Sequence, residues 1–270
     1  MSILNRPLIL SLVCCLLCAC ATSPTGRKQL MLVSEDSAIA SSKSAYVSTV
    51  KQLDDAGKLE DDWAVNKRVD VITGMLVTEA IKMRPETANW EWSVVVIDDP
   101  ETINAWCMAG GRMAIYTGLI TKLDPTDDEL AQVMAHEISH ALANHTAEKM
   151  SMQIATSVGV AAVGVAADNS GAALSGAALT AMLAVNLPNS RAAETEADRI
   201  GIELAAKAGF DPAAAATLWQ KMGKASKSNP PQFLSTHPAP TNRQEELAQL
   251  EPEMGKYYDP NAEHPIYKLD

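Results

Sequence analysis

The sequence is short of positive charge and, beyond its first twenty residues, of cysteine. Lys and Arg number 22 against 33 Asp and Glu, giving a formal net charge of −11. Broad attraction to phosphate backbones is therefore disfavoured, which argues against a nucleic-acid partner. Only Cys107 of the five cysteines lies beyond residue 20, and 270 residues exceed the size of a disulfide-stapled miniprotein. With 47% hydrophobic residues, the chain has enough apolar side chains for a globular core.

The first twenty residues have the layout of a secretion signal. One cation, Arg6, precedes an apolar run from Leu8 to Leu17 that is too short to span a bilayer. The residues that follow, ending in Cys20, resemble a bacterial lipobox. We expect residues 1–19 to be a lipoprotein signal peptide and residues 20–33 a linker lipidated at Cys20; a plain signal peptide cut nearby is the alternative. Ala21, in place of Asp, implies a periplasmic protein anchored to the inner face of the outer membrane.

Residue periodicity outlines a mainly helical chain with a small sheet. Helices are predicted from Ser34 to about Leu53 and from Asp62 to about Lys82. The β-branched run at 90–97 predicts a strand. Residues 103–108 and 112–116 flank Ala109-Gly110-Gly111, which predicts a hairpin because consecutive glycines supply the positive φ of a tight turn.

A capping box marks the start of a longer helix. Thr126 can accept a hydrogen bond from the amide of Glu129 while the Glu129 side chain reaches back to the amide of Thr126. Apolar residues continue at helical spacing through Ile138 and Leu142. The pattern predicts one helix from Thr126 to about Met150.

Three of the five histidines lie in one stretch of this helix, at positions 136, 140 and 145. His136 and His140 stand one helical turn apart, so both imidazoles can reach one ion. With Glu137 between them the order is HExxH, the zincin arrangement, in which the glutamate takes a proton from the metal's water. His145 lies about 140° around the helix from His140 and is expected to be a buried, hydrogen-bonding residue.

A second acidic pair offers the third ligand that a catalytic zinc site needs. Glu194 and Asp198 are spaced i, i+4, so on a helix both carboxylates face the same way, while Glu196 points away from that face. We assign Glu194 as a metal ligand and Asp198 as the group that orients a ligating histidine. The alternative is a solvated helix face paired with Arg191.

Together these motifs resemble one family of enzymes. The chain is similar to zinc metallopeptidases of the HtpX, CAAX prenyl protease and Oma-like type, most closely their periplasmic lipoprotein branch. The resemblance rests on five segments: Thr25 to Leu30, Asn104-Ala105 with Gly110-Gly111, His136 to His140, Arg191 to Asp198, and Ser235 to Pro238 with Arg243. Ala109 departs from the family, which usually has Pro before the glycine pair.

The resemblance implies roles as well as a fold. It implies one zinc ion per chain with Glu194 as third ligand, and Asp198 as a catalytic residue that is sometimes assigned as proton donor. His237, with Arg243 nearby, would lie at the metal as a removable fourth ligand or a transition-state donor. The implied fold class is α+β, predominantly α-helical: a gluzincin-like core with a small sheet or hairpin beside the active-site helix.

The predicted hairpin could hold substrate. Main-chain groups near Asn104 and Ala105 could pair with an extended peptide, which would select unfolded polypeptides; an ordinary core hairpin is the alternative. With Cys20 lipidated, Cys107 would be the one thiol left, so no internal disulfide could form. We expect Cys107 to be packed rather than nucleophilic.

The stretch from Met150 to Ser190 is rich in Ala and Gly, with one charged residue, Asp168. Membrane spans are one interpretation, but we prefer two soluble helices or a lid, because the side chains are mostly small and an outer-membrane lipoprotein should lack spanning helices. The expected peptidase domain covers residues 34–250, followed by a tail at 251–270.

Two functions from different classes follow. The first is a membrane-anchored zinc metalloendopeptidase that cuts misfolded or stalled cell-envelope proteins. The second is a zinc-stabilised envelope chaperone or assembly factor that binds clients without cutting, with His237 closing the fourth coordination site. A glutamate beside the ligands favours the first, because a purely structural zinc site does not need one.

Overall fold

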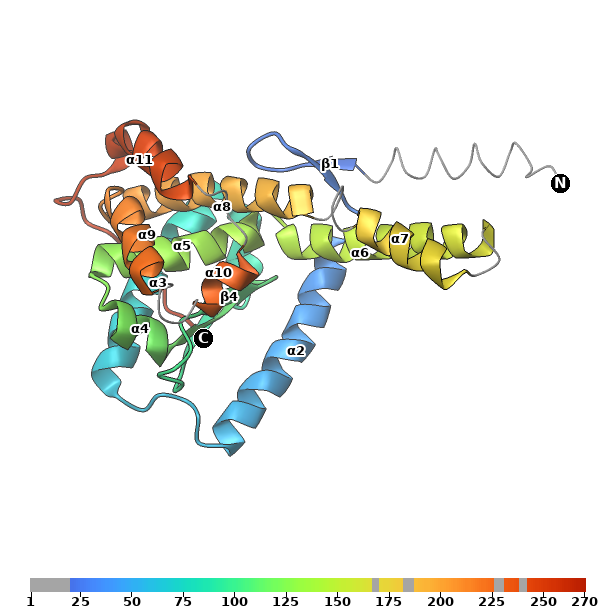
Figure 1. Ribbon diagram of the computed structural model, residues 1–270. Helices are drawn as coiled ribbons and strands as arrows, with labels where there is room; N and C mark the ends of the chain where they lie inside the picture. The colour runs from blue at the N-terminus through green and yellow to red at the C-terminus, as the bar shows by residue number, and fades with distance from the viewer. Residues whose placement is uncertain (1–19, 167–169, 182–186, 226–230, 238–241) are drawn as a thin grey trace.

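The computed structural model describes residues 20–166, 170–181, 187–225, 231–237 and 242–270 (Figure 1). These residues form a mainly helical α+β structure with small sheets, as the sequence predicted. The strands are β1 (Cys20–Thr22), β2 (Lys28–Leu30), β3 (Ser93–Ile97), β4 (Ala105–Met108) and β5 (Arg112–Tyr116). The helices are α2 (Glu35–Asp55), α3 (Trp63–Met83), η1 (Pro85–Asn89), α4 (Thr117–Leu123), α5 (Asp127–Leu142), α6 (His145–Ala166), α7 (Gly171–Ala181), α8 (Leu187–Lys207), α9 (Ala214–Ala225), α10 (Gln232–Thr236), α11 (Arg243–Met254) and η3 (Gly255–Tyr257).

The main sheet has the strand order β3-β5-β4, with β3 parallel and β4 antiparallel to β5. The predicted hairpin is therefore present, and β4 is an edge strand of this sheet among the described residues. Its turn uses positive φ at Gly110 (86°) and Gly111 (82°). A Cβ on Gly111 would lie 2.5 Å from the Trp92 ring, so the indole packs directly against the turn backbone.

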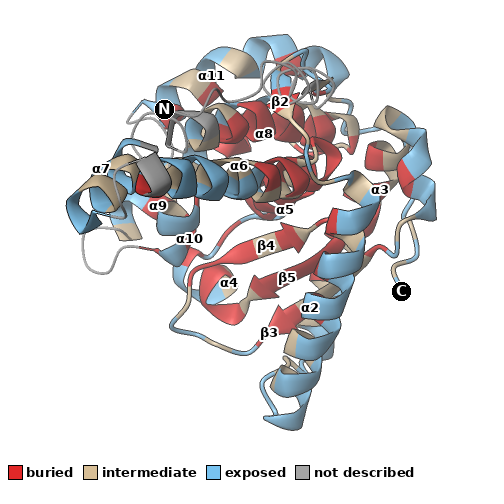
Figure 2. Cartoon of the chain, turned by 90° about the vertical axis from the view of Figure 1, so that its right-hand side faces the viewer, coloured by how far each residue is buried: buried red, intermediate tan, exposed pale blue. Residues whose placement is uncertain are grey.

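Helix α5 lies at the centre of the core, packed against α3, α8, α9 and β4 (Figure 2). It begins with the predicted capping box, in which the Glu129 amide donates to Thr126 Oγ1 (3.2 Å) and the Thr126 amide donates to Glu129 Oε2 (2.9 Å). Leu130, Met134 and Ile138 are fully buried. Each such side chain stabilises the fold by roughly 1.5–3 kcal/mol, so α5 is held firmly by its neighbours.

The end of α5 corrects the sequence prediction. The helix stops at Leu142 rather than near Met150, because Asn144 adopts a left-handed conformation (φ 57°) that asparagine tolerates better than most residues. Arg84 donates to the Leu142 carbonyl (2.8 Å), one of the groups left open at the helix end. A new helix, α6, starts at His145 and takes that histidine away from the α5 face where we placed it.

The Ala- and Gly-rich stretch forms helices where it is described. Helices α6 and α7 contact each other and extend away from the rest of the chain (Figure 1). Within the described residues, no helix has the length and hydropathy needed to cross a bilayer. The role of a lid stays a prediction.

Both ends of the described chain are more ordered than we expected. Residues 20–30, expected to be a linker, form an antiparallel hairpin of β1 and β2. At the other end, the boundary placed at residue 250 falls inside α11. The tail then returns to the domain: the amide of Tyr267 donates to Gly74 O and that of Asp270 to Trp92 O, both at 3.0 Å. The predicted signal peptide, residues 1–19, lies outside the described residues.

Candidate metal centre

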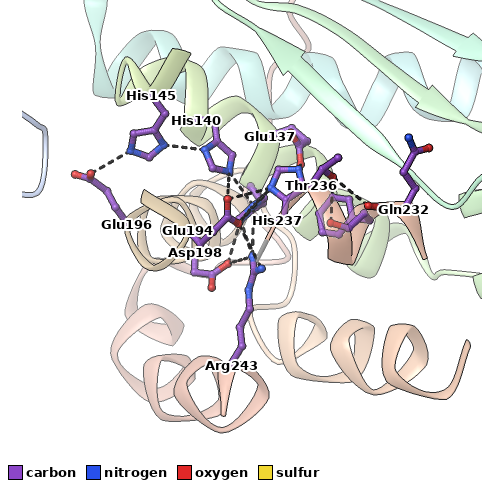
Figure 3. Close-up of polar contacts among 12 residues, drawn as sticks. Glu137, His140, His145, Glu194, Glu196, Asp198, Gln232, Thr236, His237 and Arg243 are labelled. Atoms are coloured by element: carbon purple, nitrogen blue, oxygen red, sulfur yellow. Dashed lines mark hydrogen bonds and ion pairs between the residues drawn. The ribbon is translucent and has the colours of Figure 1, made fainter. Parts of the chain in front are cut away.

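Four donor side chains, three on α5 and α8 and one just after α10, meet at one place (Figure 3). His136 and His140 lie one turn apart on α5, Glu194 comes from the facing side of α8, and His237 follows the short helix α10. Their ligand atoms all lie within 4.8 Å of one another. The structure thus brings together the three predicted ligands and the histidine that only the family resemblance placed there.

The spacing of these donors fits a tetrahedral cation. His136 Nε2 lies 3.0 Å from His140 Nε2, 3.2 Å from Glu194 Oε2 and 3.3 Å from His237 Nδ1. Glu194 Oε1 lies 3.4 Å from His140 Nε2, and Glu194 Oε2 lies 3.2 Å from His237 Nδ1. Donors at 2.0–2.1 Å from a tetrahedral zinc are about 3.3–3.4 Å apart. Imidazole and carboxylate donors at this spacing therefore suit zinc.

The charges of the cluster also favour a cation. Burial opposes ionisation of Glu194, but hydrogen bonds with His136 and His237 hold its pKa well below the ordinary value. Burial and Arg243 lower the pKa of His136, while the carboxylates of Asp198 and Glu194 outweigh them and raise it to about 9. The cluster therefore attracts positive charge, which a bound metal ion would supply in place of a proton.

Asp198 and Arg243 contact the far side of His136. Asp198 Oδ1 and Arg243 Nη2 both lie 3.0 Å from His136 Nδ1. When Nδ1 carries the ring proton, it donates to Asp198 and leaves Nε2 free to face the other donors. Arg243 is buried, pairs closely with Asp198 and lies with its guanidinium carbon 3.9 Å from the Trp219 ring centroid. Asp198 is thus placed to orient His136, and Arg243 to hold Asp198.

Glu137 is the buried acid beside the donors. Its Oε1 has no hydrogen-bond partner and lies 3.3 Å from His237 Nε2. Burial raises the pKa of this carboxyl. Glu137, His140 and Glu194 line a cavity of about 520 Å³ that also reaches Trp106 and Cys107 of β4. A buried carboxylate with an oxygen that accepts no hydrogen bond, facing a cavity, is suited to accept a proton from a molecule bound there.

The edge strand β4 runs along this cavity. The Tyr116 amide donates to Asn104 O, so by strand alternation the main-chain groups of Ala105 and Cys107 point away from β5. The side chains of Asn104 and Ala105 are buried, and Asn104 Oδ1 has no hydrogen-bond partner. Cys107 is packed as expected, and burial raises the pKa of its thiol well above the ordinary value.

Sequence reasoning missed a second group of residues behind His140. His140 Nδ1 contacts His145 Nδ1 (2.8 Å), and His145 Nε2 contacts Glu196 Oε2 (3.1 Å). Glu196, expected to point away from Glu194, does so but is buried and bound by Arg27 at 2.7 Å. The Thr-Gly-Arg segment carried part of the family resemblance, yet nothing local in the sequence linked it to Glu196.

These features are those of a metallopeptidase family. The chain belongs to peptidase family M48, a family of zinc metallopeptidases, which matches residues 65–251. This finding confirms the resemblance to Oma-like zinc metallopeptidases.

The chain is also similar to individual proteases of known name. The chain is similar to the mitochondrial metalloendopeptidase OMA1 of Schizosaccharomyces pombe, with 37% identity over 191 residues, 70% of this chain and 52% of that protein. It is similar to the OMA1 metalloendopeptidase of Bos taurus, with 32% identity over 244 residues, 86% of this chain and 46% of that protein. It also resembles the beta-barrel assembly-enhancing protease of Yersinia pestis, with 33% identity over 152 residues, 53% and 31% of the two chains. This chain thus spans only between about a third and a half of the length of these curated relatives.

Proposed function

We propose that this protein is a zinc-dependent metalloendopeptidase that hydrolyses peptide bonds of unfolded or misassembled cell-envelope polypeptides. The observation that carries the proposal is the spacing of 3.0–3.4 Å between donor atoms of His136, His140 and Glu194, with one further donor nearby, beside the buried Glu137 in a cavity. Membership of family M48 supports the class of reaction.

The residues divide the work of hydrolysis. Zinc, held by His136, His140 and Glu194, would polarise the scissile carbonyl and acidify a water. Glu137 would take a proton from a water in the cavity and deliver it to the leaving amine, a role that suits a buried carboxyl with a raised pKa. Asp198 keeps His136 in the tautomer with Nε2 free.

Substrate would lie along β4. The outward main-chain groups of Ala105 and Cys107 can pair with an extended peptide, which places its backbone beside Glu137 in the same cavity. A compact protein offers few free strands for such pairing. The edge therefore favours unfolded chains, consistent with a role in quality control.

The general base can be tested with a matched pair of variants on α5. Glu137→Gln keeps the side-chain volume but cannot take up the proton, so we expect unchanged zinc content and a loss of casein cleavage of about 10²–10⁴-fold. Glu129→Gln, also buried on α5 but at its far end, should cleave at the wild-type rate. Unchanged cleavage by Glu137→Gln would remove Glu137 from this role.

The membrane anchor and location belong to the same proposal. We infer attachment through a lipidated Cys20 to the inner face of a bacterial outer membrane, supported by the lipobox-like segment and by the beta-barrel assembly-enhancing relatives. The OMA1 relatives are mitochondrial, so the comparisons include both locations. Incorporation of labelled palmitate that Cys20→Ala abolishes would support the anchor; equal labelling of the two proteins would refute it.

One observation favours the second candidate, a chaperone or assembly factor that does not cut. His237 Nδ1 lies 3.2 Å from Glu194 and 3.3 Å from His136, and so takes the fourth corner of the donor set. A site closed in this way leaves no position for water. Two variants distinguish the candidates. Faster cleavage by His237→Ala would indicate that His237 is a removable block of a peptidase. Full cellular function of Glu137→Gln would indicate a chaperone.

A further inference from the structure

A continuous chain of polar contacts connects the metal centre to the N-terminal hairpin. It runs from His140 through His145 to Glu196 (Figure 3). The Nδ1 atoms of His140 and His145 lie 2.8 Å apart, and His145 Nε2 lies 3.1 Å from Glu196 Oε2. Arg27, in the turn between β1 and β2, then donates through Nε to Glu196 Oε2 at 2.7 Å. Thr25 of the same turn donates to the other oxygen of Glu196. Residues about 170 positions apart in the sequence thus share one network.

The chemistry of the donors fixes the direction of every bond in this chain. With Nε2 of His140 turned toward the metal donors, its proton must lie on Nδ1, which donates to His145 Nδ1. His145 then carries its own proton on Nε2 and donates it to Glu196. A carboxylate only accepts, and Arg27 only donates, so the chain ends without a mismatched pair. No other arrangement of protons on two neutral imidazoles satisfies all three contacts.

The hairpin is held in place by contacts of its own. Arg27 binds both oxygens of Glu148 on α6, at 2.7 and 2.6 Å, and Glu148 is almost fully buried. Gln29 on β2 donates to Ala143 O (2.7 Å), directly after α5 ends, and to Glu148 (2.9 Å). These bonds fix the guanidinium of Arg27 relative to the junction of α5 and α6. His145 lies at this junction, as the first residue of α6.

We propose that Arg27 is a positioning residue of the metal centre, acting through Glu196 and His145 to hold His140 in the ring orientation and tautomer that binds zinc. The inference rests on the proposed zinc site. The hairpin at residues 20–30 would then support the metal centre and would not be a mere linker. It also gives a physical reason for the break at Asn144, since a continuous α5 would carry His145 away from His140 and Glu196.

The proposal predicts a defect in metal binding. In purified full-length protein, Arg27→Met should weaken Zn²⁺ binding about 10- to 100-fold, measured by competition with a chelator of known affinity. The visible absorption of the Co²⁺-loaded protein should also change, because the His140 ring is less well oriented. Lys28→Met is the matched control. Lys28 is the next residue, is exposed, and its ammonium donates to Thr22 in the same hairpin, so zinc affinity and the Co²⁺ spectrum should stay as in the wild type.

A second variant covers the case in which Arg27→Met does not fold. His145→Phe breaks the chain at its other end without touching the hairpin, and should give the same 10- to 100-fold loss. If the two residues act through one chain, the double variant binds zinc about as weakly as His145→Phe alone.

Three results would overturn the inference. Wild-type zinc affinity in either single variant would show that the contacts do not position His140. Losses that multiply in the double variant would show two independent effects, such as separate damage to packing. Failure of the wild-type protein itself to bind zinc would remove the metal centre and hence the proposed function, a result distinct from the other two.

Discussion

Gly201 lies where α8 crosses α5, and replacing it with alanine tests how closely the two helices must approach for the metal centre to form. A Cβ at this position would lie 3.0 Å from the backbone nitrogen of His136, 3.1 Å from its Cα and 3.2 Å from the carbonyl carbon of Ala135. All three are backbone atoms within a helix, so no flexible side chain can move aside. The two helices must separate instead.

The size of the effect follows from these distances. Restoring an ordinary contact of at least 3.4 Å requires a shift of about 0.4 Å between α5 and α8. Overpacking of this kind costs about 1–3 kcal/mol, while alanine in place of glycine in a helix recovers about 1 kcal/mol. The net loss of stability is therefore about 0–2 kcal/mol. Zinc binding is more sensitive, because ligand distances must hold within about 0.2 Å and Glu194 lies on the helix that moves.

We therefore expect Gly201→Ala to remain folded but to bind zinc at least about tenfold more weakly. Chelator competition measures the affinity, and urea unfolding of the metal-free protein measures the stability. Gly223→Ala on α9 is the control: its Cβ would meet nothing within 4 Å, so the variant should gain up to about 1 kcal/mol and keep its zinc affinity. Wild-type zinc affinity in Gly201→Ala would refute the reasoning.

Three further predictions concern metal, thiol and pH. Removing zinc with a chelator should lower the Tm and adding it back should restore it, since His136 and His140 of α5 and Glu194 of α8 come together around the ion only in the folded state; an unchanged Tm would contradict this. Cys107, buried and with its pKa raised first by burial and then by Glu137, should resist Ellman's reagent at pH 8 until the protein unfolds, as mass spectrometry of the labelled peptide can show. Burial raises the pKa of Glu129, but bonds from Lys221 and the capping box outweigh it and lower the pKa overall. The ionised form therefore adds stability above its unfolded pKa of about 4.3, and this contribution is lost as pH falls through the folded value. Glu129→Gln should be less stable than the wild type at pH 7, with the difference shrinking at pH 3; an equal difference at both pH values would show that ionisation is not the cause.

Much of the fold could be predicted because its signals are local. Thr126 and Glu129 lie three residues apart and form a cap whatever the rest of the chain does. The glycine pair at 110–111 fixes the turn of the hairpin through its own backbone angles. The spacing of His136 and His140 on one helix, and of Glu194 and Asp198 on another, likewise set which side chains share a face.

The end of α5 was predicted wrongly because apolar spacing continues past it. The apolar spacing does not indicate the left-handed turn at Asn144, nor that Arg84, between α3 and η1, binds the carbonyl of Leu142. The error carried over to His145, whose burial was predicted correctly but whose partners were not. The hairpin at 20–30 and the returning C-terminal tail were missed for a similar reason, because both segments are polar and gain their order from contacts with distant parts of the chain.

By itself the sequence determined the zinc-binding residue types, their helical spacing and the mainly helical class of the fold. Only the tertiary structure decided that α5 and α8 cross closely at Gly201, that His237 reaches the other donors, and that Arg27 lies behind His140. The physical reason is the distance along the chain over which each feature is determined. Backbone angles and caps depend on neighbours a few residues away, whereas the metal centre depends on packing between helices that lie far apart in the sequence.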